Sequence, residues 1–270
     1  MRTPVISLAL TLALSAAALA DPPPTVVHLI YEGYSAGFHM LDLQSDVTIG
    51  SDGYRIEMAG HTAGMIGFVY HANWHTEADG SWTGPGVLPA HYDNQGEFGG
   101  ELRRVDMDYQ QGNPVLRVLD PPDDHEHGPV PSTLERHTVD GLSVLALAIH
   151  QIMDGGTCIG RVMSFDGREV EDRTLRTIGM EQLPNTARSS FQGPALRCDV
   201  ESHTVAGFYH NDATEAQRPY TDSIWFARLA PDLPPLPVRF TATTHHTGRV
   251  LLYLTGMSQH PSGAMSATTK

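Results

Sequence analysis

Short segments in which apolar and polar residues alternate make up most of this chain. Residues 26–32 and 38–44 show the two-residue period most clearly, and turn residues such as Gly, Asn and Asp separate the segments. Further segments rich in Val, Ile, Thr, Tyr and Phe cover residues 47–49, 54–59, 66–74, 101–109, 115–118, 159–165, 169–179, 195–207, 222–230, 238–244 and 248–255. Because alternate residues of a strand face opposite sides of a sheet, the pattern predicts about a dozen β-strands.

One stretch, residues 138–154, has a helical period instead. Thr138 or Asp140 provides an N-cap, apolar residues cover a broad face, and Gly155 and Gly156 provide a stop signal. We expect such a helix to lie against a sheet or to plug it. Together these elements predict a mainly β fold, in which a single curved antiparallel sheet forms an open barrel or spiral β-roll around one α-helix.

The middle of the chain, residues 84–131, breaks this regular pattern. Seven prolines fall in it, and proline cannot donate a hydrogen bond to a neighbouring strand. We therefore expect loops here, outside residues 101–109 and 115–118. Residues 121–129, in which acidic residues and histidines follow two prolines, predict a solvated loop.

A tight turn is predicted where the segments at 159–165 and 169–179 meet. Asp166, Gly167 and Arg168 lie between them, and Gly supplies the positive φ angle that such turns need. We expect Arg168 to pair with Asp166 or with another nearby carboxylate. Arg239 also lies in an apolar segment, and since an unpaired buried cation is costly, we expect an acidic partner beside it.

The N-terminal residues have the order of segments found in secretory signal peptides. Arg2 is followed by an apolar run over residues 5–19 and by the motif Ala18-Leu19-Ala20. A membrane-spanning helix needs about 20 apolar residues, which this run does not reach. We therefore expect cleavage after Ala20, export to a periplasm and no transmembrane segment in the mature chain. Residues 21–256 then predict a single β-rich domain, and residues 257–270 a flexible C-terminal tail.

The chain has two cysteines, Cys158 and Cys198. In an oxidising compartment such a pair predicts a structural disulfide, which closes a loop of about 40 residues and stabilises the fold by roughly 4 kcal/mol. The alternative is a redox or metal pair, which a Cys-x-x-Cys spacing would favour. That spacing does not occur in this sequence.

Charge narrows the possible partners. The formal net charge is −14, which argues against nucleic acid and against adhesion to anionic lipid surfaces, because both favour clustered positive charge. The remaining partners are an apolar ligand and an envelope protein.

Candidate chemistry is sparse. His125 and His127 lie in an acidic loop that could hold a surface divalent ion. The alternative is that both side chains are solvated, and we favour it, so no metal is predicted. The sequence has no Gly-x-Ser-x-Gly nucleophile motif, no Walker loop and no dinucleotide-binding motif. No catalytic residue and no cofactor is predicted.

The interior of a curved sheet is the remaining place for a ligand. If the helix does not fill it, the space could hold an acyl chain or another apolar molecule. The residues proposed to line it are Tyr31, Met40, Phe68, Tyr70 and Phe165. The alternative is that these side chains form an ordinary hydrophobic core.

Several short motifs follow one another in a definite order along the chain. They are Leu29-Ile30-Tyr31-Glu32-Gly33, Pro89-Ala90-His91-Tyr92, Thr138-Val139-Asp140-Gly141-Leu142-Ser143, Gly156-Thr157-Cys158, Phe165-Asp166-Gly167-Arg168, Ala195-Leu196-Arg197-Cys198, Val205-Ala206-Gly207-Phe208 and Leu229-Ala230-Pro231. This ordered set resembles the exported bacterial family described as domain of unknown function 3108 (DUF3108). The resemblance implies an envelope protein with a spiral or half-open β-barrel similar to periplasmic lipoprotein carriers. It adds support for the Cys158–Cys198 bridge and supplies no catalytic residue.

These observations favour one function over two alternatives. We expect an exported, non-enzymatic, envelope-associated protein that binds an apolar ligand or a protein partner. The alternatives are a hydrolase of an envelope polymer, which would need a polar cleft with converging His and carboxylate groups, and a structural module with no cavity.

Overall fold

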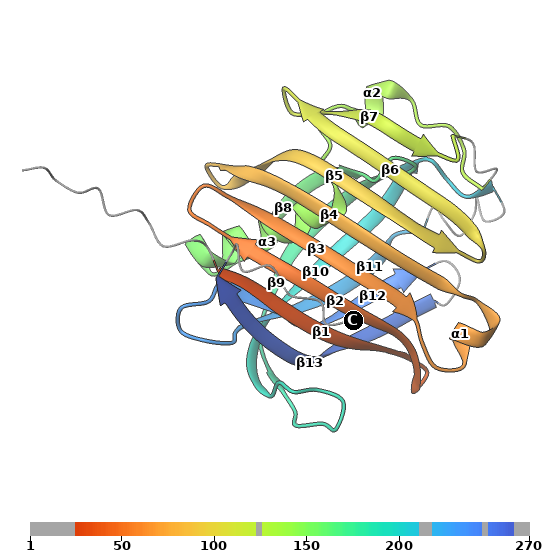
Figure 1. Cartoon of the computed structure of the whole chain (residues 1–270). Helices are drawn as coiled ribbons and strands as arrows, with labels where there is room; N and C mark the ends of the chain where they lie inside the picture. The colour runs from red at the N-terminus through yellow and green to blue at the C-terminus, as the bar shows by residue number, and fades with distance from the viewer. Residues whose placement is uncertain (1–24, 123–125, 211–217, 245–247, 262–270) are drawn as a thin grey trace, which may run out of the picture.

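The computed structural model describes residues 25–122, 126–210, 218–244 and 248–261, and in them thirteen strands form one sheet (Figure 1). The strands are β1 (Thr25–Ser35), β2 (Phe38–Ile49), β3 (Gly53–Thr62), β4 (Ala72–Thr83), β5 (Gly86–Phe98), β6 (Glu101–Gln110), β7 (Asn113–Asp120), β8 (Gly160–Phe165), β9 (Val170–Leu183), β10 (Gly193–Ala206), β11 (Tyr220–Arg228), β12 (Pro235–Thr244) and β13 (Gly248–Pro261). The helices are α1 (Ile66–Val69), α2 (Ser132–Glu135) and α3 (Gly141–Gly155).

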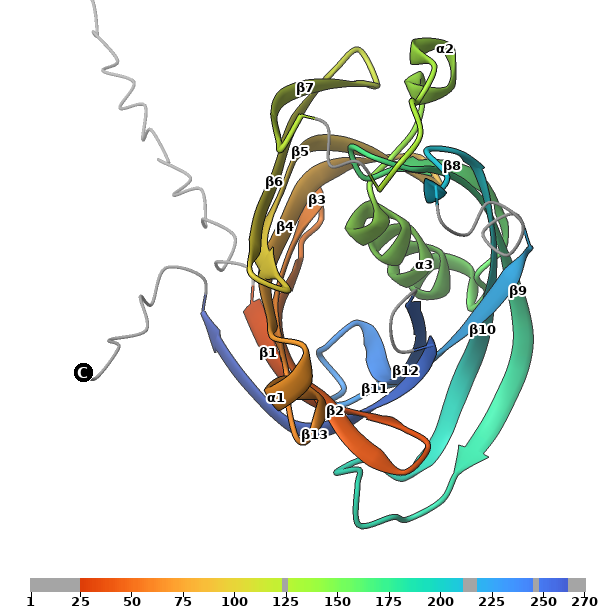
Figure 2. The ribbon, with the colours of Figure 1, turned by 90° about the vertical axis from the view of Figure 1, so that its right-hand side faces the viewer.

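All neighbouring strands are antiparallel, in the order β7-β6-β5-β4-β3-β2-β1-β13-β12-β11-β10-β9-β8. Two meanders are therefore joined where the first strand pairs with the last, and β7 and β8 are the two edges. Figure 2 shows the sheet curling into a ring around α3. The predicted mainly β fold, a single curved antiparallel sheet around one helix, is confirmed.

The edge strand β8 is partly covered by the chain that leads into α3. Val139 donates its N–H to the carbonyl of Met163 at 3.0 Å, and its own carbonyl accepts from Phe165 at 2.8 Å. A short parallel bridge results. It occupies hydrogen-bonding groups that an exposed sheet edge would offer to another chain.

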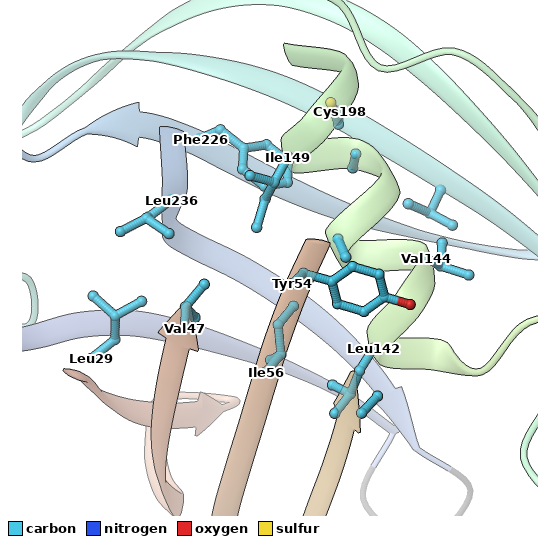
Figure 3. Close-up of a cluster of buried hydrophobic side chains, with 14 of the residues drawn as sticks. Leu29, Val47, Tyr54, Ile56, Leu142, Val144, Ile149, Cys198, Phe226 and Leu236 are labelled. Atoms are coloured by element: carbon cyan, nitrogen blue, oxygen red, sulfur yellow. The ribbon is translucent and has the colours of Figure 1, made fainter. Parts of the chain in front are cut away.

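Helix α3 begins and ends at the predicted signals. Asp140 is its N-cap and accepts from the Ser143 N–H at 2.8 Å, while Gly156 ends it in the left-handed conformation with φ of +69°. Figure 3 shows Leu142 of α3 near Ile56 of β3, and Ile149 of α3 near Phe226 of β11. These residues belong to one buried cluster. The helix thus fills part of the ring.

The segment at 66–74 was predicted as a strand, and this prediction is wrong. Residues 66–69 form α1, and β4 begins only at Ala72. The Oγ1 of Thr62 accepts from the Ala72 N–H at 3.0 Å and donates to the Tyr70 carbonyl at 3.0 Å, which closes the base of the excursion. Residues 65–69 are apolar apart from Gly67, so they lack the alternation of a half-buried strand.

The proline-rich middle contains a strand that the sequence did not predict. β5 runs from Gly86 to Phe98 and includes Pro89, which lies at a shift in the register against β4. A bulge tolerates a residue without an N–H. Pro114 likewise lies near the start of β7, at the edge of the sheet, where one side of the strand has no neighbour in the sheet.

The predicted boundaries at the chain ends need one correction. β13 continues to Pro261, and its residues 257–261 pair with β1 from Leu29 back to Thr25. A flexible tail from residue 257 is therefore wrong for residues 257–261, because the long first strand gives them a partner. Residues 262–270 and the predicted signal peptide, residues 1–20, lie outside the described residues.

Candidate functional site

A cavity of about 300 Å³ remains between α3 and the inner face of the sheet. The helix and strands β1, β2, β3, β9, β10, β11 and β12 contribute to its lining. The apolar lining residues include Leu29, Tyr31, Val47, Met58, Leu142, Val144, Leu145, Ala148, Leu175, Val200, Ile224 and Phe240. The interior of the ring is therefore not completely filled by the helix.

Small residues on one face of α3 help to keep this space open. The small residues Gly141 and Ala148 line the cavity together with Leu145, and the spacing of four and three residues places all three on one side of the helix. A Cβ added at Gly141 would meet no heavy atom within 4 Å. The helix packs closely through its other buried positions and leaves a gap on this side.

The cavity has a polar end formed by Arg173 and Tyr220. The guanidinium of Arg173 is ion-paired with Glu171 through Nη2, and Tyr220 donates its hydroxyl to Glu171 Oε1 at 2.6 Å. Ser202 and Asp222 also line this end. Within the described residues, the buried Nε of Arg173 has no hydrogen-bond partner. One donor therefore remains unused beside an apolar space.

Burial and nearby charges determine the protonation states of Arg173 and Tyr220 at this end. Burial lowers the pKa of Arg173, but the charge of Glu171 and of other nearby groups outweighs it, so the pKa is raised and the guanidinium stays charged. Burial, followed by the charge of Glu171, raises the pKa of Tyr220. Tyr220 is therefore a neutral donor to Glu171 at ordinary pH.

Cross-strand register places the polar end along the barrel. Thr241 belongs to the polar end, since it lines the cavity and donates its hydroxyl to Asp222 at 3.0 Å. It pairs with Leu251; Leu251 pairs with Tyr34, and Tyr34 with His39. Thr241 is thus level with the turn between β1 and β2. The polar end of the cavity lies at the end of the barrel that carries this turn and α1 (Figure 1).

The five residues predicted to line a cavity are dispersed. Tyr31 lines it, with its hydroxyl donating to the Pro237 carbonyl at 2.8 Å. Phe165 is buried in the core outside the cavity lining, and Met40 is only partly buried. Phe68 projects from α1 and is 93% exposed.

The fifth residue, Tyr70, lines a different hollow, a polar cleft of about 500 Å³. Here His127 Nε2 lies 3.4 Å from Glu169 Oε1, and the His127 ring packs against Tyr209 with centroids 4.1 Å apart. Burial raises the pKa of Glu169 although the hydrogen bond with His127 lowers it. We call this hollow the polar cleft.

The turn at residues 166–168 forms one wall of the polar cleft. Asp166 Oδ1 accepts from the N–H groups of Arg168 and Glu169, both at 2.8 Å. Gly167 has φ of +101°, and a Cβ there would come within 2.4 Å of Val105. The guanidinium of Arg168 donates to the Pro121 carbonyl at 2.9 Å. The turn thus ties β9 to the chain that follows β7.

The predicted acidic partner of Arg239 is absent from the described part of the chain. Its guanidinium instead lies 5.0 Å from the ring centroid of Tyr253 and 5.8 Å from that of Trp225. Aromatic faces attract a cation and exclude water from one side of it. The prediction overlooked this way of accommodating the charge.

Potential metal ligands gather elsewhere than predicted. His125 lies outside the described residues, and His127 is buried against Glu169. Two groups of three potential ligands lie on the sheet, formed by Glu57, His75 and Glu77 and by His91, Asp106 and Asp108. Arg55 donates to both glutamates of the first group, each at 2.7 Å, and Arg117 donates to Asp108 at 2.7 Å. Both groups are therefore parts of ion-pair ladders.

The predicted disulfide is confirmed. Cys158 and Cys198 are bonded, with Cα atoms 6.2 Å apart, and both are fully buried. Cys158 follows the C-terminal end of α3, and Cys198 lies in β10, so the bond fixes the helix to a wall of the cavity. In the described residues, no helix is both long and apolar enough to span a membrane.

Comparisons with known proteins agree with this architecture. No curated protein matches the chain. Among solved structures, the crystal structure of a β-barrel-like protein of domain of unknown function DUF1849 from Brucella abortus has a TM-score of 0.52 at 12% identity, and the match covers 89% of this chain and 99% of that chain. Identity this low shows the fold alone. The family model described as "Protein of unknown function (DUF3108)" matches residues 28–254, and the chain therefore belongs to the DUF3108 family.

Proposed function

We propose that this protein is an exported, non-enzymatic binding protein of the cell envelope that holds an amphipathic ligand in the cavity. One observation carries the proposal: an apolar space of about 300 Å³ ends at Arg173, whose Nε donor has no partner among the described residues. A ligand with an apolar body and a hydrogen-bond acceptor at one end would fill the space and satisfy this donor.

The size of the cavity limits the ligand. Small-molecule pockets have volumes of about 300 Å³ and upward, so this cavity is at the lower end of the range. It suits one short acyl chain or a compact apolar molecule. A lipid with several chains would not fit inside it.

The charges at the polar end limit the ligand's head group. Arg173 is already paired with Glu171, and Asp222 accepts from Thr241 Oγ1 at 3.0 Å and Thr243 Oγ1 at 2.9 Å. One cation therefore stands beside two carboxylates, which disfavours an anionic head group. We infer a neutral head with a carbonyl, ester or hydroxyl oxygen as the acceptor for Arg173.

Export rests on two supports. The first 20 residues have the segments of a signal peptide. The Cys158–Cys198 disulfide is compatible with an oxidising compartment. Both fit a binding protein that works in a bacterial periplasm.

The test is native mass spectrometry of protein taken, under non-reducing conditions, from the periplasm of an expression host, followed by solvent extraction. We expect a mass that corresponds to cleavage after Ala20 and an oxidised cysteine pair, together with a recurring neutral amphipathic adduct. A clean mass in every preparation would reject the ligand and favour a partner-binding module.

A variant pair locates the adduct. Ala148→Leu adds bulk to the cavity face of α3, and we expect it to lose the adduct at least about tenfold with little change in Tm, since the added atoms enter open space. Ala148→Ser is the matched control, because it adds a single atom and leaves room for a ligand. Equal adduct in both variants would place the ligand elsewhere.

The polar cleft favours a second candidate function, hydrolysis of an envelope polymer. It pairs His127 with Glu169, and burial raises the pKa of Glu169, as in many general acids. If this function holds, Glu169→Gln should lower hydrolysis of cell-wall polymers about a hundredfold or more. Glu101→Gln in the same cleft is the control. Absence of any hydrolysis by the unaltered protein would reject this candidate.

A further inference from the structure

Four large apolar side chains stand exposed at one end of the barrel. They are Phe38, which is 62% exposed, Met65 at 75%, Phe68 at 93% and Val69 at 86%. Phe38 begins β2, and the other three lie in and beside α1, which Figure 1 shows projecting from the same end. We call this group the apolar tip. Exposed large apolar residues that gather in one place mark an interaction surface.

The conformation of the apolar tip is specified by hydrogen bonds. Ala63 donates to the Met40 carbonyl at 2.8 Å, which joins the two loops, and Tyr70 donates to the Ile66 carbonyl at 2.8 Å. Gly64 has φ of +59°, and a Cβ there would lie 2.3 Å from the His39 carbonyl oxygen. The loops are thus held together through backbone groups, while no residue of α1 is buried.

The charge around the apolar tip differs from that of the rest of the chain. The protein has a net charge of −14, yet residues 58–76 contain no Asp or Glu. Arg188 lies beside the tip, donating to the Gly37 carbonyl at 3.1 Å and stacking 4.2 Å from the Tyr34 ring centroid. The segment that carries Met65, Phe68 and Val69 thus has no acid of its own. Burial raises the pKa of Tyr70, at the end of α1, and Glu126 and Glu101 of the polar cleft lie near enough to add to this rise.

The nearest acidic residues of β1 and β2 are engaged by other groups. Tyr34 donates its hydroxyl to Glu32 at 2.6 Å, and Asp42 lies 2.8 Å from His39 and 3.4 Å from His61. An apolar projection flanked by Tyr34 and the cation of Arg188, with Glu32 and Asp42 bound by other side chains, has the composition of a segment that enters the head-group layer of a membrane.

We propose that the apolar tip docks the protein onto a lipid bilayer by inserting Phe38, Met65, Phe68 and Val69 into the interfacial layer. A bilayer surface accepts projecting apolar side chains without requiring a matching pocket. The absence of acid in residues 58–76 reduces, at the tip itself, the repulsion from lipid phosphates that the acidic protein would otherwise experience.

The position of the apolar tip relates this docking to the cavity. The polar end of the cavity lies at the same end of the barrel, because Thr241 is level with the turn that precedes Phe38. A protein docked through the tip presents this end of the cavity to the membrane. The docking itself does not depend on the cavity binding a ligand, so the two proposals are separable.

The test is flotation of the periplasmically produced protein, its leader shown to be removed by intact mass, with vesicles of phosphatidylcholine alone or mixed with phosphatidylglycerol. We expect the unaltered protein to float with the phosphatidylcholine vesicles and Phe68→Ser/Val69→Ser to lose binding about tenfold. Ile178→Ser/Met180→Ser is the matched control, since Ile178 is 52% and Met180 is 64% exposed on β9. It should float like the unaltered protein.

A second measurement reports insertion directly. In Phe68→Trp, we expect tryptophan emission to shift to the blue on addition of vesicles and to be quenched by lipids with brominated tails. Failure of the unaltered protein to float with either vesicle would overturn the proposal. So would equal loss in the tip variant and the β9 control. Self-association that the tip variant abolishes, without vesicle binding, would assign the tip to a second copy of the chain instead.

Discussion

Two of the hollows in the described part of the barrel are opposite in character, the apolar cavity beside α3 and the polar cleft beside β5 and β6. The cavity has mostly apolar walls and one ion pair at its end, whereas the cleft is lined by charged residues that include Arg103, Glu126, Asp166 and Glu169. The smaller hollow suits a ligand that leaves water, and the larger suits one that stays hydrated. The same fold thus provides one largely apolar environment and one polar environment for a ligand.

A single row of side chains leads from one hollow to the other. Glu169 lines the polar cleft, Glu171 holds Arg173 at the end of the cavity, and Leu175 lies in its apolar wall. Glu171, Arg173 and Leu175 are two apart, so they lie on one face of β9, and Glu169 lies in the turn directly before this strand. Over this short distance the lining changes from polar, at Glu169, to apolar, at Leu175, and the Glu171–Arg173 pair marks the boundary.

Removal of the disulfide should have the largest effect on stability. It should also distinguish the two hollows, because the bond supports the walls of the cavity. We expect Cys158→Ser/Cys198→Ser to lower the free energy of unfolding by about 4 kcal/mol in urea titrations. The bond joins α3 to β10, both of which line the cavity, so adduct retention should fall as well. Reduction of the unaltered protein is the control, since it contains no other cysteine. A change below about 1 kcal/mol would contradict this account.

Loss of Arg173, the cation at the boundary between the two hollows, should have the next largest effect on stability. Glu171 is 9% exposed and Arg173 is 25% exposed. Removal of one partner of a fully buried pair costs about 3–5 kcal/mol, and we expect about 2 kcal/mol for Arg173→Met because Arg173 keeps some contact with water.

The double variant Glu171→Gln/Arg173→Met checks the cause of this loss. It removes both charges, so most of the stability should return, which thermal or urea unfolding at neutral pH would show. If the double variant is less stable than Arg173→Met, the loss comes from packing and the pair does not act as an electrostatic boundary.

A smaller effect is expected at Asp140, a fully buried carboxyl at the start of α3 that accepts hydrogen bonds from the backbone and the hydroxyl of Ser143. Burial raises its pKa above the usual 3.8, and the hydrogen bonds from Ser143 oppose this. The protonated form is therefore favoured in the fold. Its stabilising contribution is complete below the unfolded pKa and is lost as the pH rises through the folded pKa.

The variant Asp140→Asn isolates that contribution, because asparagine is also a good N-cap. The Tm of the unaltered protein minus that of Asp140→Asn should decrease as the pH rises from below 3.8 to neutrality. Asp140→Ala should instead lose about 1 kcal/mol at neutral pH through loss of the cap. A Tm difference that increases with pH would show that the ionised carboxylate is the stabilising form.

The fold could be predicted because most of its strands alternate, and the helix could be predicted because its caps are conventional residues. Two local features hid elements. Pro89 argued against a strand at β5. The strand tolerates it because Pro89 lies at a register shift against β4, and the sequence of one segment does not show how that segment pairs with its neighbour. The apolar run at residues 65–69 predicted a strand although it projects from the barrel.

The candidate site was less accessible to sequence reasoning. Tyr31 was predicted to line the cavity, but the small residues Gly141 and Ala148 that leave it open were treated as ordinary parts of a helix. The Glu171–Arg173 pair carried a signal, since the two-residue period puts both residues on the face of Leu175. Whether that face is inward depends on contacts with distant strands, including the bond from Tyr220.

The pairing of β1 with β13 sets the order in which the barrel can be assembled. The first strand takes β2 on one side and the last strand on the other, so its second ladder joins residues more than 200 positions apart. A ribosome or export channel delivers β1 long before β13. The meander from β1 to β7 can therefore fold early, while the seam remains open until the final segment arrives. In kinetic terms, closure of this seam is the long-range step of folding, and its open edge is the place where a nascent chain is most exposed to pairing with a neighbour.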